Sequence, residues 1–258
     1  MKLDIIGCST SWSSRPTSCY LLNEHIMFDC GEGTTKPLVA FYGSKMFMKV
    51  DCIFITHYHS DHFFGVIQFL SQRINFCSNE EQKQLTIYGI KGLKDALDKL
   101  FTFSNKEKVN IEDYINVIEI EDFSKPINVD GYEIMPFPLH HGDFDNCGFA
   151  IKQNNFVLGY TGDTAFDDNL LKMVKYCNAL VCEVCGKKNA VNHMGVEGYN
   201  ELRKMFPQKT FFAVHCTDPV YNDAEKLNLN KLDSGDCLEV KDNKIVKSVI
   251  KQQKLNSN

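Results

Sequence analysis

The chain has 258 residues, of which 43% are hydrophobic and 12% aromatic, so it is long enough to bury a substantial core. Its formal net charge of −5 disfavours binding of long nucleic acid, which requires a basic face, but leaves room for a small anionic substrate held by a metal ion. The sequence contains no apolar run of the roughly 18 residues that a membrane-spanning helix needs, so we expect no membrane association.

The first half of the chain alternates between strand patterns and helical patterns. Residues 61–73 carry apolar side chains at helical spacing, with Asp61 at the start as a candidate cap. The strand patterns are short runs rich in β-branched and aromatic residues. We expect strands over residues 2–6, 18–22, 25–29, 52–56 and 84–89, and helices over 61–73 and 91–103.

The second half continues the alternation, and paired strands followed by alternating strands and helices predict sheets covered by helices. No linker rich in Pro, Gly or Ser divides the chain, so we expect one domain over residues 1–258 with a frayed tail at 251–258. We expect strands over residues 132–139, 147–152, 155–162, 178–184, 209–214, 236–240 and 244–250, and helices over 167–177 and 196–206.

Four of the expected strands run directly into a histidine or an aspartate. These residues are His57, His141, Asp163 and His215. Because ligands in open α/β sheets bind at the carboxyl ends of the strands, residues far apart in the sequence can meet at one edge of the fold. The pattern therefore indicates one shared site.

The stretch "FITHYHSDHFFG", residues 54–65, holds three of the eight histidines. His57 and His59 lie two positions apart in an extended segment, so their side chains point the same way. Asp61 and His62 fall where the next helix begins, and the chain reversal there aims both across the same pocket. A strand that runs into a helix start can therefore gather all four side chains around one point.

This set of nitrogen and oxygen ligands, with no nearby thiolate in the motif, suits a pair of divalent metal ions. Imidazole plus carboxylate fits Zn²⁺, with Mn²⁺ or Fe²⁺ as alternatives. Two such ions share a hydroxide whose pKa falls to roughly 7, which gives a nucleophile without an activated serine or cysteine. In this interpretation one ion is held by His57, His59 and His141, the other by Asp61, His62 and His215, and Asp163 bridges them.

The segment "THYHSDH", residues 56–62, resembles the T-H-x-H-x-D-H signature of the metallo-β-lactamase superfamily. The similarity continues in order with "FDCGEGT", "HHGDFDNCGFAI", "YTGDT" and a late histidine that follows a strand. The resemblance implies an α/β fold with four layers, the αβ/βα sandwich, in which two mixed β-sheets are flanked by helices. It also implies a dinuclear metal-dependent hydrolase.

Within this superfamily the chain is most similar to the ribonuclease Z and phosphodiesterase branch. "ALVCEVCG" followed by "NHMGVEGYNEL" resembles the paired glutamate and histidine elements of that branch. The resemblance implies that Glu183 orients His193, that His193 donates a proton to the leaving oxygen, and that Asp61 belongs to the catalytic set. An alkoxide is a poor leaving group, so a positioned acid accelerates its departure by about 10²–10⁴.

The chain departs from the ribonuclease Z pattern at two places. Cys182 stands where a histidine usually precedes the glutamate. Ribonuclease Z also carries a long arm that grips transfer RNA, often between the strands that here lie within residues 147–164, but only the short segment "QNN" joins them in this chain. We therefore expect a small-molecule or short nucleotide phosphodiester as substrate, and the processing of transfer RNA is in doubt.

Two other functions stay open. The same metals could act on a lactone, a thioester or another carbonyl ester, in which case Glu183 and His193 would be dispensable. The protein could also be a non-catalytic metal-binding or sensing protein. The sequence does not determine the oligomeric state, so a homodimer stays open as well.

Several histidines have two interpretations. We favour His141 over His140 as the ligand because in the superfamily a short loop and a Gly-aromatic pair, here Gly148-Phe149, usually follow this histidine. His25 is expected at the surface of a hairpin turn. His193 could pack near the following helix instead of donating a proton.

Cysteines and two loop residues complete the expectations. The 11 cysteines and the absence of a secretion signal in "MKLDIIGCSTSW" favour reduced thiols and a cytoplasmic location. Cys182 and Cys185 form a CxxC without a second pair, so two buried thiols are favoured, and Cys216 is expected in the core. Arg15 is expected to be exposed, with a phosphate contact as the alternative, and Trp12 is expected in a pocket wall or an interface.

Overall fold

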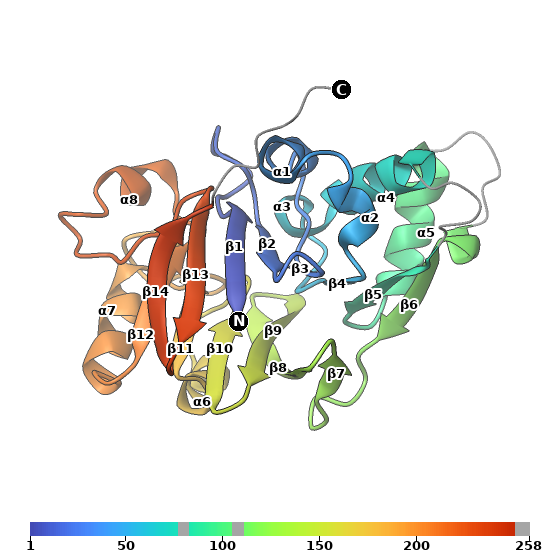
Figure 1. Cartoon of the computed structure of the whole chain (residues 1–258). Helices are drawn as coiled ribbons and strands as arrows, with labels where there is room; N and C mark the ends of the chain where they lie inside the picture. Colours follow the sequence, from blue (N-terminus) through green and yellow to red (C-terminus); the bar gives the residue numbers. More distant parts are fainter. Residues whose placement is uncertain (77–82, 105–110, 251–258) are drawn as a thin grey trace.

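Two mixed β-sheets pack face to face at the centre of the molecule, and helices cover their outer faces (Figure 1). This is seen in a computed structural model, which describes residues 1–76, 83–104 and 111–250. The expected sandwich of two sheets with flanking helices is therefore confirmed. The expected frayed tail at 251–258 lies outside the described residues.

The first sheet has the strand order β14-β13-β1-β2-β3-β4-β5-β6. The neighbours from β3 to β6 run parallel, whereas the other pairs are antiparallel. Its strands are β1 (Lys2–Gly7), β2 (Cys19–Leu22), β3 (Ile26–Phe28), β4 (Cys52–Phe54), β5 (Leu85–Gly89), β6 (Ile115–Glu119), β13 (Asp236–Lys241) and β14 (Lys244–Val249).

The second sheet has the strand order β12-β11-β10-β9-β8-β7, with parallel pairing from β10 to β12. Only Asn154 and Asn155 connect β9 to β10, so the described chain has no arm at this position. The strands are β7 (Ile127–Val129), β8 (Tyr132–His141), β9 (Phe144–Gln153), β10 (Phe156–Tyr160), β11 (Ala179–Glu183) and β12 (Thr210–Val214).

Three layers of apolar side chains hold the sandwich together. Between the sheets, the rings of Phe28, Phe54 and Phe149 have centroids 5.3 to 5.8 Å apart. The other two clusters lie beneath the helices, with Phe69 from α4 (Gly65–Phe76) in one and Tyr199 from α7 (Val196–Met205) in the other. Apolar residues of strands that are covered on both faces are therefore buried throughout, as expected for the inner strands of a layered α/β fold.

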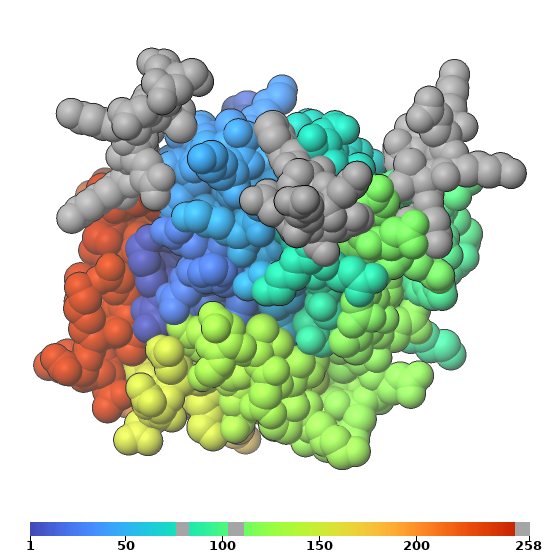
Figure 2. Space-filling view, turned by 45° about the vertical axis from the view of Figure 1, so that its right-hand side comes forward, coloured from blue at the N-terminus to red at the C-terminus, as the bar shows by residue number. Residues whose placement is uncertain are grey.

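Segments that are distant in the sequence share one surface of the molecule. In the space-filling view, the blue N-terminal part of the chain lies beside the green segment around residues 115–150 (Figure 2).

Most helices lie between consecutive strands along the chain, and α3 carries part of the histidine motif. The helices are α1 (Thr35–Tyr42), α2 (Met46–Lys49), α3 (Ser60–Phe63), α4 (Gly65–Phe76), α5 (Leu93–Ser104), α6 (Asp168–Tyr176), α7 (Val196–Met205) and α8 (Asp218–Asn222), with a short 3-10 helix at Ile111–Asp113.

The structure corrects the expected helix over 61–73. It consists of two helices, α3 and α4, and the N-cap residue of α3 is His59 rather than Asp61. Asp61 lies in the first turn of α3, and its side chain accepts a hydrogen bond from the backbone N–H of Ser11. Asp61 was wrongly interpreted as a cap because the sequence does not reveal this distant partner.

Several short elements were not expected from the sequence. They include β6, an edge strand whose apolar Ile118 lies at an exposed position, so apolar and polar residues do not alternate in its sequence. The helices α1, α2 and α8 also lack a side-chain cap that would mark their start. Within residues 1–76, 83–104 and 111–250, none of the helices is long and apolar enough to cross a membrane.

Candidate metal centre

The structure brings His57, His59, His141 and Asp163 together from three separate segments. Nε2 of His57 lies 3.0 Å from Nδ1 of His59, and Nε2 of His141 lies 3.2 Å from the same atom. The Asp163 Oδ2 atom is 3.8 Å from Nε2 of both His57 and His141. The candidate ligand atoms of these four residues all lie within 4.8 Å of one another, which is the spacing of side chains around one ion.

A second group consists of Asp61, His62 and His215, and its ligand atoms also lie within 4.8 Å of one another. Nε2 of His215 is 3.1 Å from Oδ2 of Asp61. His215 follows β12 and adopts a φ of +52°, a conformation that is unusual for a residue other than glycine. Its backbone N–H donates to the Cys8 carbonyl at 2.7 Å, which helps to hold it there.

Asp163 presents one carboxylate oxygen to each group. Its Oδ2 atom faces His57 and His141, whereas its Oδ1 atom lies 3.1 Å from Nε2 of His62 and 3.4 Å from Nε2 of His215. Asp163 Oδ1 and His62 Nε2 are buried and form no hydrogen bond with the described residues. Buried polar atoms without partners are costly, and two cations between these groups would satisfy them. The residues present therefore fit a pair of metal ions.

A buried carboxylate orients one of these imidazoles. Asp29 is fully buried, and its Oδ2 atom lies 2.7 Å from Nδ1 of His62. The same carboxylate accepts hydrogen bonds from the Thr56 N–H at 2.8 Å and from the Tyr160 hydroxyl at 2.5 Å. Such contacts fix the tautomer of a ligating histidine, so Nε2 of His62 is left to face the site. Asp29 was missed as a functional residue, although its expected strand also ends at an aspartate.

The loop after β3 supports the helix that carries Asp61 and His62. Backbone N–H groups of Cys30 and Glu32 donate to the carbonyls of His62 and Ser60 at 2.7 and 3.0 Å. Gly31 packs so closely that a Cβ atom there would lie 2.0 Å from the carbonyl oxygen of Asp61. The backbone of the motif "FDCGEGT" thus packs directly against the backbone of the helix that carries Asp61 and His62.

Glu183 and His193 lie beside the two ligand groups. Oε2 of Glu183 is 2.9 Å from Nδ1 of His193, and the Thr164 N–H donates to the other carboxylate oxygen. Glu183 is fully buried at the end of β11, whereas the His193 side chain is 21% exposed. The imidazole ring of His193 lies 4.7 Å from that of His141, centroid to centroid. The buried carboxylate therefore holds an imidazole that solvent can reach.

Burial and neighbouring charges lower the pKa of some titratable side chains of the site and raise the pKa of others. Burial lowers the pKa of His57 and of His141, so their imidazoles are neutral and available as ligands. Burial also lowers the pKa of His62, but Asp163 and Asp29 outweigh it and raise this pKa well above the usual value. Burial raises the pKa of Asp61, but the hydrogen bond from His215 and the nearby imidazoles bring it down to about 2.

A comparison with models of protein families shows to which family the chain belongs. The family model described as anti-Pycsar protein Apyc1 matches residues 1–232. The chain belongs to this family. The matched range contains both ligand groups, Glu183 and His193.

This Apyc1-family protein is also similar in sequence to ribonuclease Z. It is 50% identical over 136 residues to ribonuclease Z of Streptococcus sanguinis (strain SK36), a match that covers 52% of this chain and 42% of that protein. It is 33% identical over 130 residues to ribonuclease Z of Ligilactobacillus salivarius (strain UCC118), covering 50% of this chain and 39% of that protein. These matches thus span less than half the length of the curated relatives. The expected resemblance to the ribonuclease Z branch is confirmed.

Solved structures establish the fold of the Apyc1-family protein. The metallo-β-lactamase fold protein YhfI from Bacillus subtilis superposes with a TM-score of 0.74 at 18% identity, covering 92% of this chain and 98% of that one. Human tRNase Z, short form, superposes with a TM-score of 0.71 at 19% identity, covering 93% and 100%. A diphosphatase from the PhnP family gives a TM-score of 0.73 at 16% identity, covering 93% and 98%. The expected metallo-β-lactamase sandwich is therefore confirmed.

The candidate metal centre of the Apyc1-family protein opens into a pocket of about 320 Å³. Trp12 lines this pocket and is 85% exposed, so it forms part of the wall, as one of the two interpretations had it. Cys182 is buried in the core, but Cys185 also lines the pocket, next to Glu183 and His193. Both thiols are buried, as expected, but the sequence did not reveal that Cys185 also lines the pocket.

The choice between the two neighbouring histidines is resolved, and His25 and Arg15 lie away from the metal groups. His140 is exposed and its ring lies against the Asp167 carboxylate, whereas His141 is 1% exposed and faces the other histidines. His25 is exposed in the turn between β2 and β3, as expected. Arg15 is only partly exposed, and its guanidinium donates to the Cys216 carbonyl at 2.9 Å, so it braces the loop that carries Trp12.

Proposed function

We propose that this protein is a zinc-dependent phosphodiesterase with a dinuclear site and a metal-bridging hydroxide. The proposal is carried by one observation: a buried Glu183 holds His193 beside two ligand groups that share Asp163. The similarity to ribonuclease Z supports a phosphodiester as the bond that is cleaved. Mn²⁺ and Fe²⁺ stay alternatives, because they accept the same ligand types.

The proposed roles follow from the geometry. His57, His59 and His141 would hold one ion, Asp61, His62 and His215 would hold the other, and Asp163 has an oxygen available to each group. Bound divalent ions supply Lewis-acid stabilisation of the phosphoryl oxygens and a hydroxide nucleophile at neutral pH.

Glu183 and His193 would supply the proton that the leaving oxygen needs, and Asp61 would act as a positioned ligand. Glu183 holds Nδ1 of His193, which leaves Nε2 of His193 free to deliver a proton to the leaving oxygen. Asp61, held by Ser11 and His215, keeps its ligand oxygen in place. The reaction thus needs a positioned acid in addition to the metals, because an alkoxide leaves poorly without protonation.

The substrate we propose is a small molecule or a short nucleotide. The pocket over the metal centre has about 320 Å³, which suits a ligand of that size. Only two residues connect β9 to β10, where ribonuclease Z often has its arm. Long nucleic acid is also disfavoured by the net charge of −5. A cytoplasmic location and a homodimer stay predictions.

The test is hydrolysis of bis(p-nitrophenyl) phosphate by the zinc-loaded protein. We expect turnover that a chelator abolishes and that zinc restores. His57→Ala should lower the rate by at least about a hundredfold, since one ion loses a ligand. Hydrolysis that continues unchanged after chelation, or in His57→Ala, would place the activity elsewhere.

The same protein should be assayed with a lactone and a thioester. A thioester expels a thiolate, which needs no general acid, so His193→Ala would keep full activity on the thioester. Strong ester hydrolysis together with no cleavage of phosphodiesters would favour that alternative. No turnover of either class by a protein that binds two metal ions would favour a sensing role.

A further inference from the structure

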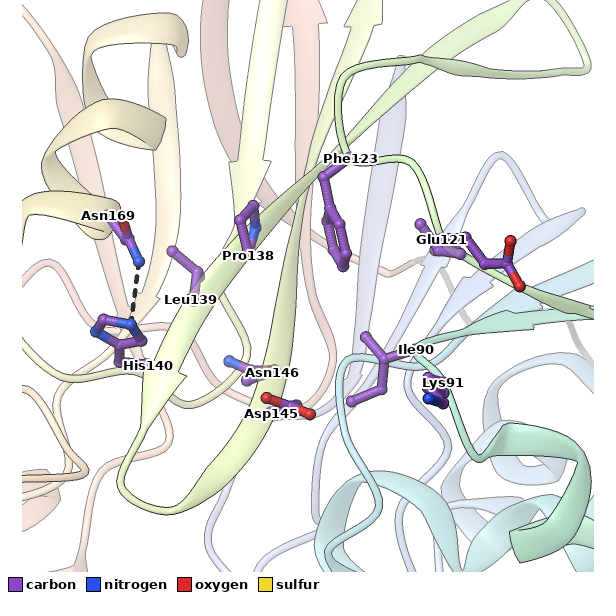
Figure 3. A pocket seen from close by; sticks show the side chains of 11 residues that line it. Ile90, Lys91, Glu121, Phe123, Pro138, Leu139, His140, Asp145, Asn146 and Asn169 are labelled. Carbon is purple, nitrogen blue, oxygen red and sulfur yellow. Dashed lines mark hydrogen bonds between the residues drawn. The ribbon is translucent and has the colours of Figure 1, made fainter.

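A second cavity is lined in part by the β8–β9 hairpin, which also carries His141. It has about 550 Å³, and none of its lining residues lines the metal pocket. In Figure 3 one wall is the hairpin, with Pro138, Leu139 and Asp145, and the opposite wall carries Ile90 and Phe123. The cavity is therefore formed between the two sheets, by segments distant in sequence.

The position of this cavity is typical of a ligand site. Ile90 and Lys91 directly follow β5, and Ile120 directly follows β6, both strands of the parallel part of the first sheet. Ligands in α/β folds bind where the carboxyl ends of such strands leave a crevice. The volume also lies within the roughly 300–1,000 Å³ that small-molecule pockets occupy. Both the volume and the position of the cavity are therefore those of a small-molecule site.

The lining combines an apolar body with a few charged groups. Ile90 and Ile120 are 6% and 7% exposed, belong to the apolar cluster between the sheets and form an apolar floor, and the Phe123 ring packs against the same cluster. An apolar floor with few polar groups selects a compact ligand with a flat apolar body.

The charged groups of the lining are mostly acidic. Lys91 provides one positive charge, whereas Asp145 and Glu121 provide two negative charges, a net of −1. His140, also in the lining, is already paired with Asp167. In Figure 3 the Asp145 carboxylate points from the hairpin toward Ile90, across the cavity. A carboxylate beside an apolar floor favours a cation that can donate hydrogen bonds.

We propose that this cavity is a second ligand-binding site, separate from the metal pocket, for a compact organic cation with a flat apolar body, such as a ring that bears an amidine or amine group. The ring packs between Phe123 and the apolar floor, and its N–H groups donate to Asp145. This inference does not depend on the proposed phosphodiesterase activity.

Both walls of the cavity contact residues of the metal centre. The Tyr58 hydroxyl donates to the Ile90 carbonyl, and Tyr58 lies between His57 and His59 in the sequence. On the other wall, the Asn146 amide donates to the backbone carbonyl of Asp163. A ligand that moves either wall therefore acts on the segments that position the metal ligands, which makes the cavity suited to regulation.

The test uses benzamidine, with benzamide as its neutral analogue, in nuclear magnetic resonance titrations of the zinc-loaded full chain. We expect benzamidine to bind about tenfold more tightly than benzamide, because only the cation forms a charge-assisted bond with Asp145. Its amide signals should shift at Lys91 and Asp145, and also at Tyr58. Asp145→Asn should remove the preference for benzamidine, and Phe123→Ala should weaken both ligands about fivefold.

Asp242→Asn is the matched control, because Asp242 is an exposed carboxylate in the turn between β13 and β14. It should bind benzamidine as the unaltered chain does. Thermal unfolding of each variant confirms that it is folded before titration. The proposal is overturned if benzamidine shows no saturable binding, if benzamide binds equally well, or if Asp145→Asn and Phe123→Ala leave the benzamidine affinity unchanged.

Discussion

Nδ1 of His193 lies 2.9 Å from Oε2 of Glu183, and this contact links a fully buried carboxylate to an imidazole at the metal pocket. The two residues are ten positions apart, one at the end of β11 and the other in the loop before α7. The buried partner cannot rotate into solvent, so the orientation of the imidazole is set by the fold. Because of this contact, His193 could either donate a proton or only shape the site, and an experiment can separate these two roles.

If His193 is the acid, its importance depends on the leaving group. His193→Ala should lower kcat by about 10²–10⁴ on a phosphodiester with an alkoxide leaving group, because that oxygen needs a proton. The loss should be less than about tenfold with p-nitrophenolate, which leaves without protonation. Steady-state assays on the two substrates measure the difference. An equal loss on both would mean that His193 shapes the site rather than donating a proton.

Asp29 is predicted to act on metal affinity through His62. Asp29→Asn keeps the size of the side chain but weakens the hydrogen bond that fixes Nδ1 of His62. We expect zinc affinity to fall about 10- to 100-fold, as is usual when the partner of a ligating histidine is lost. Competition with a chromophoric chelator measures the affinity.

The matched control for this variant is Asp4→Asn. Asp4 is also fully buried, but its partners are the Tyr42 hydroxyl at 2.5 Å and Lys2 at 2.7 Å, not a histidine of the metal centre. Both variants should lower the free energy of unfolding, whereas only Asp29→Asn should lower zinc affinity. Equal zinc affinity in the two variants would refute the role given to Asp29.

The convergence of the candidate metal ligands could be predicted because local sequence marks several of them: His57, His141, Asp163 and His215 each follow an apolar strand pattern. An apolar run that ends at a histidine or an aspartate, as before His141 and Asp163, can be recognised without knowledge of distant contacts. Asp29 carries the same mark at the end of β3, and consistent use of the pattern would have found it. The roles of all these residues, and the single domain over residues 1–258, stay predictions.

Other features could not be predicted because they depend on distant contacts. The backbone of Ser11 reaches Asp61 across 50 positions, and nothing near Asp61 indicates this bond. The second cavity forms between the end of β5, the segment after β6 and the β8–β9 hairpin, so its shape exists only after the sheets pack. Strand β6 was missed because, on the edge of the sheet, the apolar Ile118 occupies an exposed position and the acidic Glu119 a half-buried one, so apolar and polar residues do not alternate in the sequence.

Buried thiols should make the protein sensitive to high pH. Burial raises the pKa of the Cys177 thiol to about 12. This folded-state pKa is above that of an unfolded chain, about 8.5, so the stability from the neutral thiol is complete below that pH and is lost as the pH rises toward 12. One such group changes the free energy of unfolding by up to about 1.4 kcal/mol per pH unit.

Cys177→Ala should therefore flatten the decline in stability between about pH 9 and 11 by close to one proton. Urea unfolding of the two proteins at several pH values measures the slopes. Since the ten cysteines in the described ranges are all free and buried, several of them contribute to the total decline, and the variant should remove only one share. Parallel curves for the two proteins would contradict the shift given for Cys177.

The glycine behind the histidine motif provides a last test, which separates stability from metal binding. A methyl group at Gly31 would lie 2.0 Å from the carbonyl oxygen of Asp61 and 2.4 Å from Oγ1 of Thr17. Because the first of these is backbone, α3 must move. Gly31→Ala should lower the free energy of unfolding by roughly 1–3 kcal/mol and weaken zinc binding by at least about tenfold.

Gly33→Ala is the control within the same loop. Its methyl group would meet no atom within 4 Å, but its φ of +77° is unfavourable for alanine. The variant should lose roughly 1–2 kcal/mol of stability from backbone strain alone and keep its zinc affinity, since nothing presses on α3. Chemical unfolding and chelator competition on both variants give the comparison. If both lose zinc affinity to the same extent, loop stability rather than the contact with Asp61 controls the metal centre.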